Sequence, residues 1–108
     1  MGGDSRSPAG VRLMNDYAAR WPLWWVEGGQ VGDDELPLSG ALARDLRSWA
    51  QHFEDHFDHL DGWDRAASRA DHARLARDLL ARLGGELGGM PVRADLWELE
   101  GPPADARA

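Results

Sequence analysis

The segment SGALARDLRSWAQHFEDHFDHL, Ser39 to Leu60, decides the fold that we predict from this sequence. Its apolar residues recur at spacings of three and four, which is the period of a helix with one apolar face. These residues are Leu42, Leu46, Trp49, Phe53, Phe57 and Leu60. Ser39 suits the N-cap, because its hydroxyl can accept a hydrogen bond from a first-turn amide that lacks a partner within the helix. We therefore predict an amphipathic helix from Gly40 to about Leu60.

A second helix follows a tight link, Asp61 to Asp64. Its apolar face carries Leu75, Ala76, Leu79, Leu80, Leu83 and Leu87, and it ends at Gly88-Gly89. Two helices joined by so short a link form an antiparallel hairpin. A hairpin with one apolar side needs a second layer to cover that side, so we expect a sheet.

Three short segments around the helices have the alternation or the bounding residues of strands. They are Val11 to Tyr17, Leu23 to Val26 and Pro91 to Leu99. If the first two form an antiparallel hairpin, the helix pair returns the chain so that the third strand runs parallel to the first. The predicted fold class is α+β, a two-layer sandwich in which the helix hairpin packs on one face of a small mixed sheet of two or three strands. The element order is β-β-α-α-β.

The length and composition favour one domain without covalent cross-links. At 108 residues the chain fits a single core, which we expect to occupy residues 11–100, with disordered tails at 1–10 and 101–108. The sequence has no cysteine, which excludes disulfides and thiolate chemistry. It shows neither the apolar stretch of a signal peptide nor the apolar run of a membrane span, so we expect a cytoplasmic protein.

The charge is acidic and unevenly distributed. A formal net charge of -7, from 12 basic and 19 acidic residues, repels phosphate backbones and anionic lipid, so we expect neither nucleic acid nor membrane as a partner. Between Glu27 and Asp61, nine acidic residues face two arginines. Such a segment can bind a basic protein with an affinity that falls steeply with salt, although solvated surface acid explains the same excess.

Tryptophan is abundant, and the segment RWPLWW, Arg20 to Trp25, holds three of the six tryptophans. Side chains alternate between the two faces of a strand, so Trp24 and Trp25 cannot both face the helices. In the last strand, an inward Val92 would place Trp97 on the opposite face. We thus predict apolar side chains on both faces of a sheet that the helices cover on one face only.

The uncovered face defines a candidate interaction patch, whose members are Met14, Tyr17, Trp21, Trp24, Trp25 and Trp97. Exposed indole rings forgo much of the burial that stabilises a small domain, so something should cover them. The cover can be the chain's own segment 17–38, a second copy, another protein, or a small molecule. We predict a small, non-enzymatic protein-interaction module that forms a homodimer or binds another protein through this patch.

The run HFEDHFDH, His52 to His59, supports an alternative function. Histidines one helical turn apart can bind one divalent metal ion, and the helix hairpin can bring a histidine of the second helix near them. The alternative is a small metal-binding protein or enzyme that uses His52, His56 and His72 with nearby carboxylates and a divalent metal as cofactor. The main prediction has no cofactor and no catalytic residue. The same run is also typical of a solvated helix flank, with His72 as a hydrogen-bonded core histidine.

Four segments resemble a family of short, uncharacterised proteins from high-G+C bacteria. They are RLMNDY (Arg12 to Tyr17), WPLW (Trp21 to Trp24), LPLS (Leu36 to Ser39) and DLW (Asp95 to Trp97). The resemblance covers most of residues 11–99. It implies no activity, so it assigns no catalytic or binding residue, but it implies that the tryptophan segment and the last strand belong to one folded unit.

Overall fold

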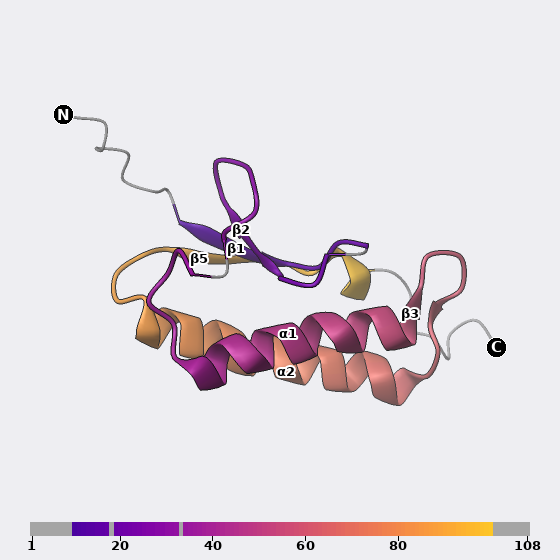
Figure 1. Cartoon of the computed structure of the whole chain (residues 1–108). Coiled ribbons are helices and arrows are strands. Elements are labelled where there is room, and N and C mark those ends of the chain that lie inside the picture. The colour runs from indigo at the N-terminus through magenta and orange to yellow at the C-terminus, as the bar shows by residue number, and fades with distance from the viewer. Residues whose placement is uncertain (1–9, 18, 33, 101–108) are drawn as a thin grey trace.

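A three-stranded sheet lies over two long helices in the computed structural model, which describes residues 10–17, 19–32 and 34–100 (Figure 1). The elements in chain order are β1 (Val11–Met14), β2 (Leu23–Trp25), α1 (Gly40–His56), β3 (Phe57–Asp58), β4 (Gly62–Trp63), α2 (Ala66–Glu86), β5 (Val92–Asp95) and the 3-10 helix η2 (Trp97–Leu99). The α+β class and the β-β-α-α-β order are therefore confirmed, with a small β3–β4 hairpin added between the helices. The predicted tails lie outside the described residues except for Gly10.

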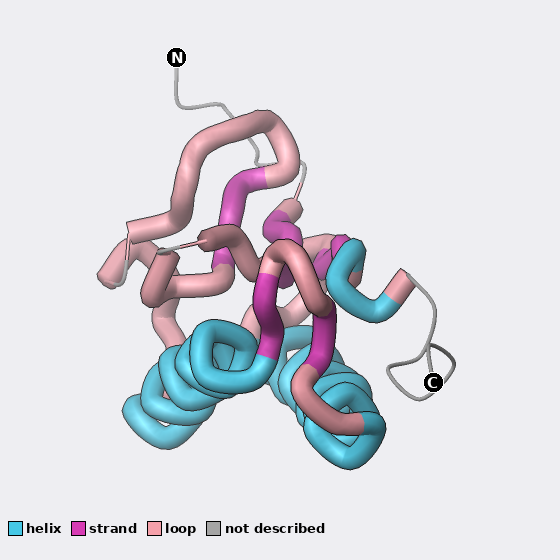
Figure 2. Tube along the Cα trace, turned by 90° about the vertical axis from the view of Figure 1, so that its right-hand side faces the viewer, coloured by secondary structure: helices cyan, strands magenta, loops and turns pink. Residues whose placement is uncertain are grey.

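The sheet order is β2-β1-β5, so the first strand is the central one. β1 is antiparallel to β2 and parallel to β5, with Val11 opposite Trp25 on one side and opposite Val92 on the other. The predicted parallel relation of the last strand to the first is confirmed. A parallel pair needs a long crossover, and here the helix pair provides it on one face of the sheet (Figure 2).

The apolar core lies between the sheet and the helix pair. Val11 and Leu13 of β1 are fully buried, and each helix adds one residue per turn from its apolar face. These helix residues are Leu42, Leu46, Trp49, Ala76, Leu79 and Leu83. Burying a leucine stabilises the folded state by about 2 kcal/mol, so the spacing of these residues dictates how the two layers meet. Within the described ranges, no helix has both the length and the apolar character that crossing a membrane requires.

A carboxylate joins the start of α1 to the end of α2, at the open end of the helix hairpin. Ser39 is the N-cap of α1, as predicted, and its Oγ accepts the amide of Leu42 at 3.1 Å. Glu86, the last residue of α2, accepts the Ser39 amide at 2.6 Å and the Ser39 hydroxyl at 2.7 Å. A capping box takes this acid from the third residue of the helix, which here is Leu42; α2 supplies it instead. These two hydrogen bonds lower the pKa of Glu86.

The first helix ends earlier than predicted, at His56 rather than near Leu60, and the chain then forms the β3–β4 hairpin. The carboxylate of Asp58 accepts the amides of Leu60 and Asp61, both at 2.9 Å. Gly62 has a φ of 78°, which glycine adopts without steric cost. Turn chemistry therefore overrides the helical spacing of the apolar residues in this segment.

The last strand also ends earlier than predicted, at Asp95, and the chain turns into η2. Trp97 lies against Phe53 of α1 and Phe57 of β3, with ring centroids 5.6 Å apart in each pair. The prediction that Trp97 faces away from the helices is therefore wrong. It assumed an extended backbone, whereas Leu96 already leaves the strand conformation (φ -102°, ψ 53°).

Candidate functional site

Three polar side chains are buried together between the sheet and the helices. Asn15 follows β1, His72 lies on α2 and Glu98 lies in η2, and they are 1%, 0% and 4% exposed. Glu98 Oε2 accepts the Asn15 amide at 2.9 Å and lies 2.7 Å from His72 Nε2. We call these three residues the polar core. They join the sheet, a helix and the C-terminal 3-10 helix, and they confirm the prediction of a hydrogen-bonded core histidine at His72.

The three side chains of the polar core lie within hydrogen-bond distance of one another. Glu98 Oε2 is the acceptor that Asn15 Nδ2 and His72 Nε2 share. Asn15 Nδ2 also lies 3.1 Å from His72 Nε2. On the other side of the ring, His72 Nδ1 lies 3.3 Å from His52 Nδ1. Burial, followed by the charges of His72 and His56, lowers the pKa of His52, which suits a neutral acceptor.

Three tryptophans donate hydrogen bonds to backbone carbonyls of the polar core. Trp49 donates its indole N–H to the carbonyl of His72 at 3.1 Å. Trp63 donates to the carbonyl of Glu98 at 2.9 Å, and Trp97 donates to the carbonyl of Asn15 at 2.8 Å. The Trp49 ring also stacks on His72, with centroids 4.4 Å apart. Each residue of the polar core thus receives one indole hydrogen bond on its backbone, which fixes the position of all three segments.

The polar core is closed to substrates. The side chains of His72 and Glu98 are both 0% exposed, and the second carboxylate oxygen, Glu98 Oε1, is buried without a hydrogen-bond partner among the described residues. A histidine paired with a carboxylate is a common catalytic arrangement, but a general base must reach the proton that it removes. This pair therefore acts in folding.

The β3–β4 hairpin lies where α1 leads into α2, at one end of the helix pair (Figure 2). Its surroundings are acidic and mostly exposed. The hairpin borders a hollow of about 310 Å³, whose lining includes five acidic residues. They are Glu54, Asp55, Asp58, Asp61 and Asp64. Leu60 at the tip is 76% exposed. Tyr17 is 48% exposed, and its ring lies 6.0 Å from that of His59 in the same turn. We call Tyr17, Glu54, Asp58, Leu60 and Asp61 the hairpin end.

The electrostatics of the hairpin end follow from its acids. Burial, then the negative charges of Asp58, Asp16 and Glu54, raise the pKa of Tyr17. The amides of Asp61 and Leu60 lower the pKa of Asp58, so that carboxylate is ionised at neutral pH. The surface around the Tyr17 ring therefore carries a negative potential.

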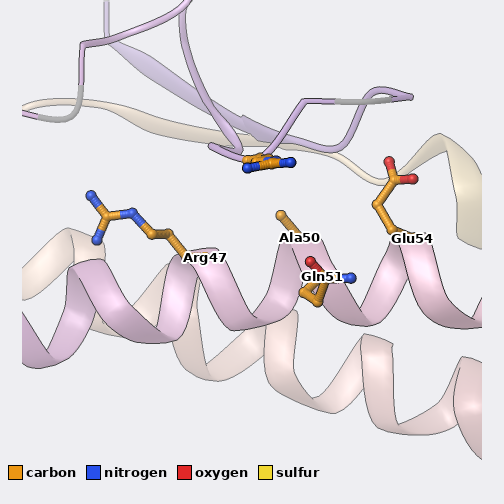
Figure 3. A pocket seen from close by; sticks show the side chains of 5 residues that line it. Arg47, Ala50, Gln51 and Glu54 are labelled. Carbon is orange, nitrogen blue, oxygen red and sulfur yellow. The ribbon is translucent and has the colours of Figure 1, made fainter.

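A second, smaller hollow of about 210 Å³ lies along α1, and its lining includes Arg47, Ala50, Gln51 and Glu54 (Figure 3). The guanidinium of Arg47 lies 5.0 Å from the centre of the Trp21 ring, which is the distance of a cation–π contact. Trp21 is 8% exposed. The chain itself therefore covers Trp21, from the side of α1.

The structure distributes the predicted interaction patch over several environments. Trp25 is partly buried and packs against the core, whereas its neighbour Trp24 pairs with Arg12 and is half-buried on the other face. Met14 is half-buried, and its carbonyl accepts the Trp24 indole N–H at 3.0 Å. Trp21 and Trp97 pack on the helix side, and Tyr17 belongs to the hairpin end. The alternation of Trp24 and Trp25 is as predicted.

The structure brings all three proposed metal ligands close together, because the His52 ring lies 4.6 Å from the His56 ring and 5.5 Å from the His72 ring, centroid to centroid. His52 and His72 are neighbours, but His72 Nε2 faces Glu98, and His56 Nδ1 lies 2.7 Å from Asp64 Oδ2. In the described part of the chain, no group of three or more His, Cys, Asp or Glu side chains could hold a metal ion. The ring nitrogens in this region are instead engaged with carboxylates and with one another.

Two residues of the polar core were not predicted from the sequence. Asn15 and Glu98 lie in segments assigned to strands, and glutamate is almost never fully buried unless it is paired. The available signal was His72 in the middle of an apolar helix face, because a buried imidazole requires a polar partner from elsewhere in the chain.

Fold and site together define a class of small α+β protein with a sealed polar core and an acidic, partly apolar surface at one end. The sequence profile that matches it is that of the Serratia CdiI immunity protein-like family, over residues 9–91, and the chain belongs to this family. No curated protein matches the chain. The predicted resemblance to a family of short bacterial proteins is compatible with this assignment but less specific.

Proposed function

We propose that this chain is an immunity protein that binds and neutralises a partner toxin without catalysing a reaction. The single observation that carries the proposal is its membership in the Serratia CdiI immunity protein-like family across residues 9–91. An immunity protein acts by binding its toxin and does not need to catalyse a reaction. The sealed position of the His72–Glu98 pair is consistent with a protein that needs a surface and no open reaction centre.

The charge of the chain supports a basic toxin as the partner. The formal net charge is -7, and five acidic residues line the hollow at the β3–β4 hairpin. Complementary charge accelerates association and makes it sensitive to salt. We place the encounter in the cytoplasm, where a toxin that has entered the cell would meet the protein.

The test is a binding and protection assay with a candidate toxin domain, sought among the genes that neighbour the gene of this chain. We expect a 1:1 complex in size-exclusion chromatography and restored growth when both proteins are expressed together. A toxin domain from an unrelated toxin–immunity pair is the matched control, and it should neither bind nor be neutralised. A toxin that remains free and fully active in excess of the chain would refute the proposal.

Self-association through the outer face of the sheet is a second candidate, and Trp24 is the observation that favours it. This ring is half-buried on the face that the helices leave uncovered. If it forms a dimer contact, light scattering should give twice the monomer mass, and Trp24→Glu should return the monomer. A monomeric wild-type chain would rule this candidate out and leave toxin binding untouched.

A further inference from the structure

We propose that the hairpin end is the surface that docks the toxin, with Leu60 entering an apolar recess that lysine and arginine side chains of the toxin surround. This inference rests on the proposed function and adds the place and the chemistry of the contact. Three features of the hairpin end support this docking: its exposed apolar side chains, the rigidity of the hairpin and the charge around it.

The exposed apolar side chains both belong to the hairpin end. Among the described residues, the large apolar side chains that stand exposed are Tyr17 and Leu60. The Tyr17 ring lies 6.0 Å from the ring of His59, which directly precedes Leu60. Exposed apolar and aromatic side chains that gather on one protrusion are typical of the centre of a protein interface. The hairpin end therefore has the apolar anchor that docking requires.

The hairpin is held rigid before any partner arrives. The Asp58 carboxylate ties the turn through two backbone amides. At its base, Phe57 packs against Phe53 and Trp63, with ring centroids 5.1 Å and 5.2 Å away. Trp63 is in turn bonded to the carbonyl of Glu98. A loop that is already ordered loses little conformational entropy on binding, so more of the contact energy appears as affinity.

Charge selects the kind of partner. Glu54, Asp58 and Asp61 are exposed. The charges of Asp58 and Glu54 act on Tyr17, and Asp58 and Asp61 lie in the turn that carries Leu60, so a partner that places acidic groups here would be repelled. A basic surface would be attracted and oriented, while Leu60 would contribute through burial. Acidic residues alone would attract a basic partner in a salt-sensitive and poorly specific way. An apolar side chain among them fixes how the partner is oriented on this surface.

The test measures the affinity of the candidate toxin domain for two hairpin variants by titration calorimetry. Leu60→Ser removes the apolar tip without changing the charge, and Glu54→Gln with Asp61→Asn removes two charges without changing the tip. Each should raise Kd by about tenfold or more, and the double variant should also flatten the dependence of the association rate on salt. Glu27→Gln with Asp34→Asn is the matched control, because it removes two exposed acids from the loop between β2 and α1.

The outcomes separate the two proposals. The docking proposal is supported if the wild type and the control bind the toxin equally and both hairpin variants bind it weakly. All variants must also keep the wild-type unfolding temperature. Wild-type affinity in both hairpin variants would overturn this inference and leave toxin binding intact. A wild-type chain that does not bind the toxin would overturn the proposed function and this inference together.

Discussion

The polar core and the hairpin end use the same residue types in opposite surroundings. Both combine histidine or aromatic rings with carboxylates, and the run His52 to Leu60 borders both. His52 lies against His72 of the polar core, whereas Glu54 and Leu60 are exposed and belong to the hairpin end.

The difference teaches that burial, and not residue type, decides what these side chains do. In the polar core every contact is with the protein's own chain, so a change there alters folding. At the hairpin end the Leu60 side chain is mostly exposed, so a change of that residue should alter binding and leave folding almost intact. Four changes of sequence test this division, and their effects on stability should decrease in the order Glu98, Trp63, His52 and Leu60.

Glu98→Ala should have the largest effect on stability. It removes the acceptor of both His72 and Asn15, and breaking a buried pair by deleting one partner costs about 3–5 kcal/mol. Urea unfolding followed by tryptophan fluorescence measures the change in the free energy of unfolding. A loss below about 1 kcal/mol would show that the polar core is not a stabilising unit. His72→Leu with Glu98→Leu is the companion variant, and it should cost less than Glu98→Ala because it leaves no orphaned polar group.

Trp63→Phe should have an intermediate effect, because Trp63 joins the two regions. The phenyl ring can keep the contacts with Phe57 and His72, but the hydrogen bond to the Glu98 carbonyl is lost. We expect a loss of about 1–2 kcal/mol in the free energy of unfolding. Hydrogen exchange of the β3 and β4 amides should also become faster than in the wild type. Unchanged exchange there would mean that the hairpin is held independently of the polar core.

His52 should make stability depend on pH. Its pKa is lowered in the folded state from the usual 6.5, so below that pH the unfolded state binds more protons than the folded state. Stability should therefore decrease as the pH falls from about 6.5 through the lower, folded pKa. His52→Gln should flatten this part of the curve, measured by urea unfolding at a series of pH values, whereas His59→Gln, at the exposed hairpin, is the control. A steeper curve for the His52 variant would contradict the assignment of a neutral acceptor.

Leu60→Ser should have the smallest effect on stability, within about 0.5 kcal/mol of the wild type. The side chain is mostly in solvent, so its removal exposes little that was buried. Thermal unfolding checks this directly. A much larger loss would mean that Leu60 is part of the folded core, and the division between the two regions would fail.

Local patterns predicted most of the fold. The spacing of apolar residues gave both helices, and Ser39 marked the start of α1 because an N-cap depends only on its own first turn. The parallel pairing of the first and last strands followed from counting chain reversals. The errors fell at element ends, where Asp58 and Gly62 form a turn that competes with helix continuation, and where Leu96 leaves the strand.

The candidate site was less predictable for a physical reason. His72 was identified as a buried histidine from its place on an apolar face, but its partners Asn15 and Glu98 come from segments distant in sequence. No local pattern indicates which distant carboxylate will satisfy a buried imidazole. The acidic segment was visible as a charge excess, but the exposure of Leu60 depends on the helix ending at His56, which the apolar spacing concealed.

Because β1 pairs in parallel with β5, the sheet cannot be complete until its last strand has been synthesised. Val11 pairs with Val92, so the central strand leaves the ribosome long before its second neighbour has been made. During synthesis, β1 therefore presents one open edge until both helices have emerged, and open edges invite wrong pairing between nascent chains. The time before a new molecule can fold completely therefore depends on how fast the ribosome reaches residue 95, the end of β5.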